Sequence, residues 1–265
     1  MYSTILTNIV NNIYKTEGEK QKNLLKYFCN NLRYCKLETL IKYKAFIVIS
    51  NDYLKRFDKD LEDYPNLNIY IQGKCKLYSR LIIPIWGFDN KVHSFLIFDD
   101  GRRENGIILG KDQYIAYETL NNKDFEKGKY WLMYPNLFKE AFNKKYICIV
   151  DGTFDAINLN TLEIPTVALL SSNLTKYHRE YLKFIPNWII VADNDRAGKE
   201  LFEYSRKFNN HCVRLIFNNK YKDIDDYIKN NINLENEENI KNNEIINTIN
   251  KIKSTGFLLN MEMGV

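Results

Sequence analysis

Four short apolar runs in the second half of the chain restrict its possible folds more than any other feature. Each has five or six residues, is rich in β-branched or aromatic side chains and is apolar almost throughout: YICIV (146–150), TVALL (166–170), WIIVA (188–192) and CVRLIF (212–217). Such runs are typical of strands that are covered on both faces. Because segments with helical spacing lie between them, the pattern predicts parallel βαβ units, that is, an α/β domain with a parallel sheet flanked by helices.

Two of the intervening segments illustrate the helical spacing. Residues 196–208 carry a predicted apolar stripe that consists of Ala197, Leu201, Tyr204 and Phe208. In residues 175–184, the hydroxyl of Thr175 is suited to cap the first turn of a helix. Both segments are therefore predicted to cover the sheet.

The first half of the chain is less regular. Residues 20–45 have apolar side chains at helical spacing, and residues 81–88 and 92–98 are predicted to pair as a hairpin. The tail is rich in Asn and Glu with scattered Ile, and it is predicted to be helical. We therefore expect a mixed α+β, basic N-terminal subdomain over 1–144, the α/β domain over 145–230 and a short helical tail over 231–265.

Charge is distributed unevenly along the chain. Residues 1–145 contain 24 Lys and Arg against 17 Asp and Glu, a balance of +7, whereas residues 146–265 contain 14 against 16, a balance of −2. A basic half would attract polyanions, and an acidic half would hold cations. Chance in a Lys-rich chain explains the same imbalance, so charge alone does not establish a nucleic-acid partner.

The five cysteines are odd in number, widely spaced and without a CxxC pair, which argues against both a disulfide framework and a zinc site. Cys148 and Cys212 lie inside apolar runs and are predicted to be core thiols. No apolar run is long enough to span a bilayer, and the N-terminal residues do not form a signal peptide. We expect a reducing, cytoplasmic setting with no membrane partner and no zinc.

Acidic residues follow three of the four predicted strands. They are Asp151 and Asp155 after the first strand, Asp193 and Asp195 after the third, and Asp223 and Asp225 after the fourth. Because the carboxyl ends of parallel strands lie at one edge of a sheet, these carboxylates are expected to converge. Each pair alone would suit a solvated loop, but three pairs at one edge favour a site for a hard divalent cation such as Mg²⁺.

The acidic motifs read VDGTFDA (150–156), VADNDRAG (191–198) and KDIDDYI (222–228). In this order they resemble the Toprim domain of bacterial and phage, DnaG-like, DNA primases. Two upstream segments are similar to the core of the same family: SRLIIPIWGFDNKVHSFLIF (79–98) and QYIAYETLNNKDFEKGKYWLM (113–133). The resemblance covers about residues 75–230 and implies a Toprim domain over 145–230.

The resemblance also implies roles for individual residues. The implied catalytic residues are Asp151, Asp193, Asp195 and Lys127. The implied metal ligands are Asp151, Asp193, Asp195, Asp223 and Asp225, and Asp155 is the supporting acid. The residues implied to bind nucleotides or nucleic acid are Arg80, Lys111, Lys127 and Lys129. Asp151 is one methylene shorter than the glutamate of the family, and Gln113 stands where the family has a lysine, which leaves Lys111 as a substitute.

The activity that the resemblance implies is RNA primer synthesis from NTPs on a single-stranded DNA template, with Mg²⁺ or Mn²⁺, during replication in a bacterium or a phage-infected cell. A Toprim-type metal-dependent nuclease and a non-catalytic single-stranded-DNA-binding subunit of the replisome are the alternatives. Implied partners are a hexameric replicative helicase and a zinc-binding module acting in trans. One face of the tail, with Ile245, Ile249 and Ile252, is expected either to contact the helicase or to pack back on the sheet.

Overall fold

The structure is a computed structural model, and its helices and strands divide between two compact units. The first comprises Met1–Arg33 and Leu40–Glu126, and the second comprises Tyr34–Thr39 and Lys127–Val265. The residues that the structure describes are 2–31, 35–48, 54–57, 81–98, 103–104, 107–108, 112–115, 130–170, 173–192, 195–216, 221, 224–241, 243–254 and 262–264. Among the helices in these ranges, none has both the length and the apolar character needed to cross a membrane.

The first unit contains a four-stranded antiparallel sheet. Its strand order is β1-β2-β3-β6, with β1 at Phe46–Ile47, β2 at Leu81–Trp86, β3 at Val92–Phe98 and β6 at Asp112–Ile115. Strands β2 and β3 form the predicted hairpin, in which Ile83 lies opposite Leu96. The short strands β4 (Arg103–Glu104) and β5 (Ile107–Ile108) pair separately, and a 3₁₀ turn occupies Leu54–Phe57.

A long helix, α1 (Tyr2–Asn31), packs against this sheet. Its buried stripe consists of Ile5, Leu6, Ile9, Val10 and Ile13, which recur at the spacing of one helical face. The buried Gln21 side chain bonds both backbone groups of Ile47, donating to the carbonyl at 3.0 Å and accepting from the N–H at 2.8 Å, so it attaches β1 to the helix. The predicted helical region 20–45 is thus the end of α1 followed by α2 (Leu37–Lys42).

The second unit contains a six-stranded sheet of order β12-β11-β10-β8-β9-β7. The strands are β7 (Trp131–Leu132), β8 (Tyr146–Val150), β9 (Thr166–Leu169), β10 (Asn187–Val191), β11 (Cys212–Ile216) and β12 (Glu262–Gly264). Strands β8 to β12 are parallel, and only the edge strand β7 pairs antiparallel, with β9. The four predicted strands are therefore confirmed, and they lie side by side in the centre of the sheet.

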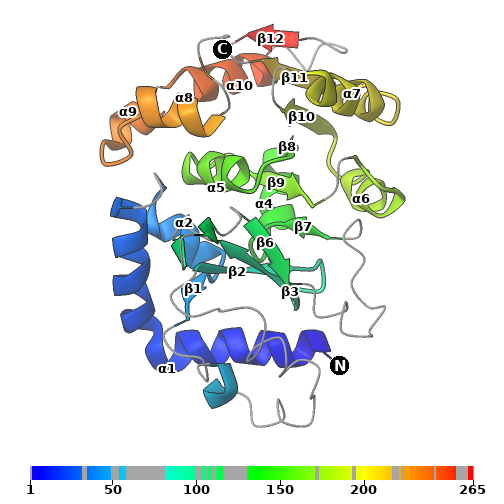
Figure 1. The fold of residues 1–265 in the computed structure, drawn as a ribbon. Helices are drawn as coiled ribbons and strands as arrows, with labels where there is room; N and C mark the ends of the chain where they lie inside the picture. The colour runs from blue at the N-terminus through cyan, green and yellow to red at the C-terminus, as the bar shows by residue number, and fades with distance from the viewer. Residues whose placement is uncertain are drawn as a thin grey trace. The chain divides into compact units, whose positions relative to one another are not determined.

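Helices cover both faces of this sheet, as predicted for an α/β domain. They are α4 (Leu137–Lys144), α5 (Thr153–Thr161), α6 (Lys176–Leu182), α7 (Arg196–Ser205), α8 (Ile224–Asn231), α9 (Glu237–Lys241) and α10 (Glu244–Ser254). Figure 1 shows α5, α8 and α10 on one side of the strands and α6 and α7 on the other. The thiols of Cys148 and Cys212 are fully buried between these layers, so both are core residues as predicted.

Helix α7 forms as predicted but buries a different face. Its buried residues are Gly198, Leu201, Phe202 and Ser205, whereas Ala197 is exposed. Leu201 is buried as predicted, but Gly198, Phe202 and Ser205 take the places expected for Ala197, Tyr204 and Phe208, so a neighbouring row of the helix meets the sheet. Phe208 lies beyond the helix, 44% exposed, with the Arg179 guanidinium 4.1 Å from its ring centroid.

The tail packs inside the second unit. Ile245, Ile249 and Ile252 are at most 2% exposed, so the face that was expected either to contact a helicase or to pack back is buried within the chain itself. The Tyr227 hydroxyl of α8 donates to Glu244 of α10 at 3.4 Å, and Lys253 Nζ lies 5.4 Å from the Tyr146 ring centroid. Of the two alternatives for this face, packing back within the chain is the one that the structure shows.

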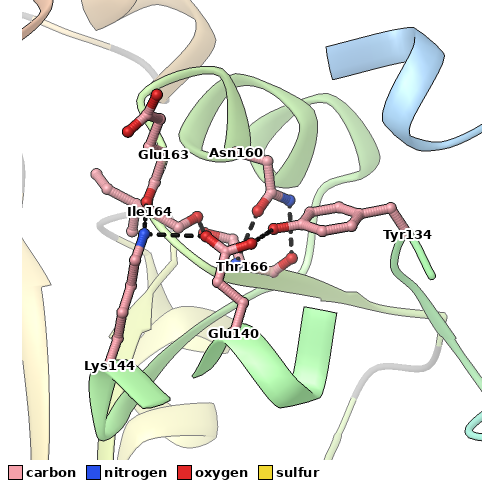
Figure 2. Close-up of polar contacts among 7 residues, drawn as sticks. All are labelled: Tyr134, Glu140, Lys144, Asn160, Glu163, Ile164 and Thr166. Atoms are coloured by element: carbon pink, nitrogen blue, oxygen red, sulfur yellow. Dashed lines mark hydrogen bonds and ion pairs between the residues drawn. The ribbon is translucent and has the colours of Figure 1, made fainter. Parts of the chain in front are cut away.

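A polar network holds the amino ends of β8 and β9 (Figure 2). Lys144 Nζ donates to Glu140 Oε1 at 2.9 Å and to the Glu163 carbonyl at 2.6 Å, and the Tyr134 hydroxyl donates to Glu140 Oε2 at 2.6 Å. Beside it, Asn160 and Thr166 exchange two hydrogen bonds of 2.9 and 3.0 Å. These contacts join α4 to the turn between α5 and β9. They therefore fix the amino ends of β8 and β9 relative to each other.

Candidate active site at the carboxyl edge of the parallel sheet

The order of the strands creates a topological switch point between β8 and β10. These strands are neighbours, but the connection from β8 leads to β9 on one side, and the connection from β10 leads to β11 on the other. Where two adjacent connections leave in opposite directions, a crevice forms beyond the carboxyl ends of the strands, and ligands bind there in open α/β sheets. The three strands that carry the predicted acids, β8, β10 and β11, are consecutive at this edge.

Asp151 is the first residue after β8, at the carboxyl end of that strand. The residue as a whole is exposed, yet protein atoms close to its carboxylate remove part of its hydration. This desolvation raises the pKa of Asp151 above its usual value, and the negative charge of Asp195 raises it further. Hydrogen bonds from the backbone N–H groups of Asp151 and Gly152 act in the opposite direction. The carboxylates of Asp151 and Asp195 are therefore close enough to repel each other.

Asp195 also has a structural role, because it is the N-cap of α7. Its Oδ1 accepts a hydrogen bond of 2.8 Å from the Gly198 N–H, which satisfies a backbone donor of the first helical turn. Within the described part of the chain, Oδ2 accepts no hydrogen bond and Asp195 has no ion-pair partner. One oxygen thus anchors the side chain while the other faces away from the cap, which is a suitable arrangement for a metal ligand.

Asp155 lies in the first turn of α5, directly behind Asp151. A Cβ atom added to Gly152 would lie 1.9 Å from Asp155 Oδ2, which means that the carboxylate is packed against the glycine backbone. Only a residue without a side chain leaves room for it there. The carboxylate of Asp155 thus lies against the backbone of Gly152, the residue that follows Asp151.

Two helices begin at this edge with their positive ends toward it. Helix α5 follows Asp151 after the N-cap Gly152, and α7 follows Asp195. The unpaired N–H groups and the dipole at a helix N-terminus favour an anion such as a phosphate. The site therefore combines carboxylate oxygens, which suit a divalent cation, with two helix N-termini, which suit phosphate groups.

Some predicted site residues lie outside the described residues. They are Arg80, Lys111, Lys127, Lys129, Asp193 and Asp223, together with the side chain of Asp225. Asp225 is the second residue of α8. This helix follows β11 and packs against α5. In the described ranges, no group of three or more His, Cys, Asp or Glu side chains is arranged to hold a metal.

Sequence reasoning missed the capping role of Asp195 and the contact of Asp155 with Gly152. The first had a signal, because an Asp followed three residues later by the first buried helical residue is a common N-cap pattern. The second had none, because it depends on the rotamer of Asp155 in the folded helix.

Comparisons with known proteins agree with this geometry. Residues 148–228 match the Toprim-like family. No curated protein matches the chain in sequence. Among solved structures, the zinc-binding and RNA polymerase domains of the Aquifex aeolicus primase align with a TM-score of 0.63 at 17% identity, over 96% of this chain and 64% of that one. This chain therefore spans slightly less than two thirds of the Aquifex chain.

Two further primase structures are similar. A DnaG primase catalytic domain bound to single-stranded DNA aligns with a TM-score of 0.63 at 16% identity, over 90% of this chain and 81% of that one. The Escherichia coli primase catalytic core aligns with a TM-score of 0.60 at 15% identity, over 96% and 85%. Residues 148–228 are therefore a Toprim-like domain, set in a chain that has the fold of the DnaG primase catalytic core.

Proposed function

We propose that the protein is a DNA primase that joins ribonucleotides into primers on single-stranded DNA during replication. The observation that carries the proposal is the placement of Asp151 and Asp195 after β8 and β10, the two strands that flank the switch point of a Toprim-like sheet. The likeness to a DnaG catalytic domain bound to single-stranded DNA supports the choice of template. The same residues fit nucleotidyl transfer, in which charge on phosphates must be neutralised and reacting groups oriented.

The residues fit a divalent cation, since a cation held by Asp151 and Asp195 would stabilise the charged form of Asp151, which desolvation chiefly and the charge of Asp195 in part disfavour. Asp193, Asp223 and Asp225 are the further proposed ligands, with Asp155 supporting Asp151. When bound, Mg²⁺ or Mn²⁺ would stabilise the charge of the triphosphate and of the attacking oxygen. A zinc ion is not expected at a site of carboxylate oxygens.

The chain's own groups would do the rest of the positioning. The N–H groups at the starts of α5 and α7 would hold phosphate oxygens, and the Asp195 cap would keep α7 in place. Arg80, Lys111, Lys127 and Lys129 are proposed to neutralise further phosphate charge, with Lys127 acting at the nucleotide. Replacing these residues by Gln should reduce the incorporation of nucleotides and leave the fold largely unchanged.

Primer synthesis on single-stranded DNA with labelled NTPs and Mg²⁺ or Mn²⁺ tests the proposal. Asp151→Asn should reduce synthesis more than about a hundredfold, because loss of groups that only support metal ligands already costs about ten- to a hundredfold. The matched control is Glu163→Gln, an exposed residue at the opposite, amino edge of the same sheet, and it should retain synthesis.

The outcomes separate the alternatives. Metal-dependent cleavage of DNA without primer synthesis would identify a nuclease, and single-stranded DNA binding without either reaction would identify a non-catalytic subunit. Primer synthesis that survives in Asp151→Asn would refute the proposed site.

A further inference from the structure

Helix α6 and the turn after it carry two parallel rows of side chains on their outward surface. Tyr177, Tyr181 and Phe184 are spaced i, i+4 and i+7, and the exposed Lys176 and Lys183 lie beside them at i and i+7. Arg179, between the two lysines in sequence, turns instead to the Phe208 ring, 4.1 Å from its centroid. Residues at these spacings lie on one helical stripe. The buried side of the helix is formed by His178 and Leu182, so both rows lie away from the core. We call the row of Tyr177, Tyr181 and Phe184 the aromatic ridge.

The outer part of the aromatic ridge is exposed to solvent. Phe184 is 62% exposed and Tyr181 is 39% exposed, while Tyr177 is half-buried. Neighbouring cations lie against rings of this surface. Lys176 Nζ is 5.0 Å from the Tyr177 centroid, and Lys183 Nζ is 5.4 Å from the Phe184 centroid. The exposed rings of Tyr181 and Phe184 are adjacent on one stripe, and contiguous exposed apolar groups are a feature of interaction surfaces.

The charge of this surface identifies the kind of partner. Residues 176–186 contain three cations, Lys176, Arg179 and Lys183, and one acid, Glu180. Glu180 is already paired with Lys183 at 2.5 Å, and Lys176 has no ion-pair partner among the described residues. Residues 146–265 as a whole are slightly acidic, with 14 Lys and Arg against 16 Asp and Glu. With Arg179 stacked on Phe208, the outward surface of α6 carries Lys176 and Lys183 against Glu180, a small positive excess in a slightly acidic half of the chain that suits a polyanion.

We propose that the aromatic ridge and its cation row form a binding track for single-stranded DNA. Aromatic faces on which bases stack, combined with cations that follow the backbone, are the features by which proteins hold single strands without reading their sequence. An acidic protein segment would use the cations but would leave the row of flat rings unexplained. The track would bind the template, and it would do so whether or not the chain catalyses primer synthesis.

The position of α6 in the sheet gives the track a direction. The helix connects β9 to β10, two strands that both run parallel to β8, so it begins near the carboxyl edge and ends near the amino edge. Tyr177 is therefore at the end of the track nearer to the acidic site, and Phe184 is at the far end. A template strand passing the site would have a surface to follow along the side of the Toprim-like domain.

The test is binding of a fluorescein-labelled oligothymidylate of about 30 nucleotides, long enough for more than one contact surface, to the full chain by anisotropy with EDTA present. The double variant Tyr181→Ala with Phe184→Ala should weaken binding at least about fivefold, since each stacked base contributes about 1–3 kcal/mol. Phe142→Ala is the matched control, because Phe142 is 60% exposed on α4 and belongs to no such row. Its affinity and the thermal stability of all variants should remain those of the parent chain.

A second variant tests the cation row. Lys176→Gln with Lys183→Gln should make the slope of log K against log[salt] less steep by about 1.4, because each phosphate contact on a single strand contributes about 0.7. If both double variants kept the oligonucleotide affinity and the salt slope of the parent chain, the proposal would be overturned. The same result would be expected if the surface bound an acidic peptide and not DNA. Failure of the proposed enzyme would be seen separately, as absent primer synthesis in a chain whose track still binds the oligonucleotide.

Discussion

Asp195 serves two purposes that substitution can separate, because it caps α7 through Oδ1 and contributes a negative charge beside Asp151. Asparagine caps a helix about as well as aspartate but carries no charge. We therefore expect Asp195→Asn to abolish primer synthesis with an unchanged melting temperature. Asp195→Ala should lose synthesis and also about 1 kcal/mol of stability. Thermal denaturation measures the stability of the two variants, and a primer-synthesis assay measures their activity. If Asp195→Ala lost no more stability than Asp195→Asn, the capping hydrogen bond would contribute no measurable stability.

A methyl group at position 152 should force the Asp155 side chain to move. In Gly152→Ala the new Cβ would meet Asp155 Oδ2 at 1.9 Å, so the carboxylate must move away from the start of α5. We expect a loss of about 1–3 kcal/mol in urea denaturation, typical of an overpacked site, together with reduced synthesis. Gly18→Ala is the control, because nothing lies within 4 Å of its added Cβ in α1, and it should be neutral or stabilising by up to about 1 kcal/mol. A neutral Gly152→Ala would show that Asp155 moves without cost.

His178 should make stability depend on pH. It is fully buried, its Nδ1 accepts from the Thr175 N–H, and Nε2 lies 3.2 Å from the Tyr130 carbonyl, which it can meet only as a donor. Burial lowers its pKa from 6.5 to about 4. Between these values the unfolded chain binds a proton that the folded chain does not, so stability falls as the pH falls below 6.5.

From pH about 7.5 to pH about 5 the loss attributable to His178 should be about 2 kcal/mol. Comparing denaturation of the parent chain with that of His178→Gln, which can still donate to Tyr130 and cannot be protonated, isolates this contribution. Parallel pH profiles for the two proteins would contradict it.

At the scale of single residues, the sequence was most informative where chemistry follows directly from position. Asp151 and Asp195 could be placed at strand ends because an apolar run stops immediately before each acidic motif. The electrostatic contact between them could not, because it requires β8 and β10 to be neighbours although β9 lies between them in the chain. Strand order depends on how the connections cross the sheet, and local composition does not encode it.

Among the helices, α10 provides the clearest test of what the tail does. Ile249 is 2% exposed, so Ile249→Ala should cost about 2–5 kcal/mol, the range for large-to-small changes in a packed core. Asn250→Ala is the control at the next, exposed position and should change stability by less than about 0.5 kcal/mol. Chemical denaturation of both variants gives the comparison. An unaffected Ile249→Ala would mean that the tail is not part of the cooperative fold.

The elements that sequence predicted well are those with one unambiguous environment. The strands β8, β9, β10 and β11 are covered on both faces, and the hairpin β2–β3 has a turn at its centre, so apolar runs and a polar break were sufficient. The face of α7 was wrong in part: Leu201 is buried as predicted, but Phe202 and Ser205 are buried where Tyr204 and Phe208 were expected, and the orientation of a helix on its sheet depends on packing that its own residues do not determine. The edge strands β7 and β12 have two or three residues each and take their identity from the neighbour with which they pair.

For the whole molecule, the uneven charge predicts how single-stranded DNA would bind. Residues 1–145 have a balance of +7, so contacts from this half should be made chiefly to phosphates. Log K should then fall linearly with log[salt], by about 0.7 for each phosphate neutralised. Anisotropy titrations over a range of salt concentrations, with EDTA present to remove metal effects, measure the slope. Affinity that does not change with salt would contradict a phosphate-based interface.

The division of the chain between its two units has a consequence for synthesis on the ribosome. The segment Tyr34–Thr39 belongs to the second unit, and the buried hydroxyl of Thr39 accepts a hydrogen bond of 3.0 Å from Thr161, 122 residues later. At about 5–20 residues per second, translation separates the two by about 6–24 s. The second unit therefore cannot fold completely from its C-terminal residues alone. The segment Tyr34–Thr39 leaves the ribosome early and must remain unpaired until Thr161 has been synthesised.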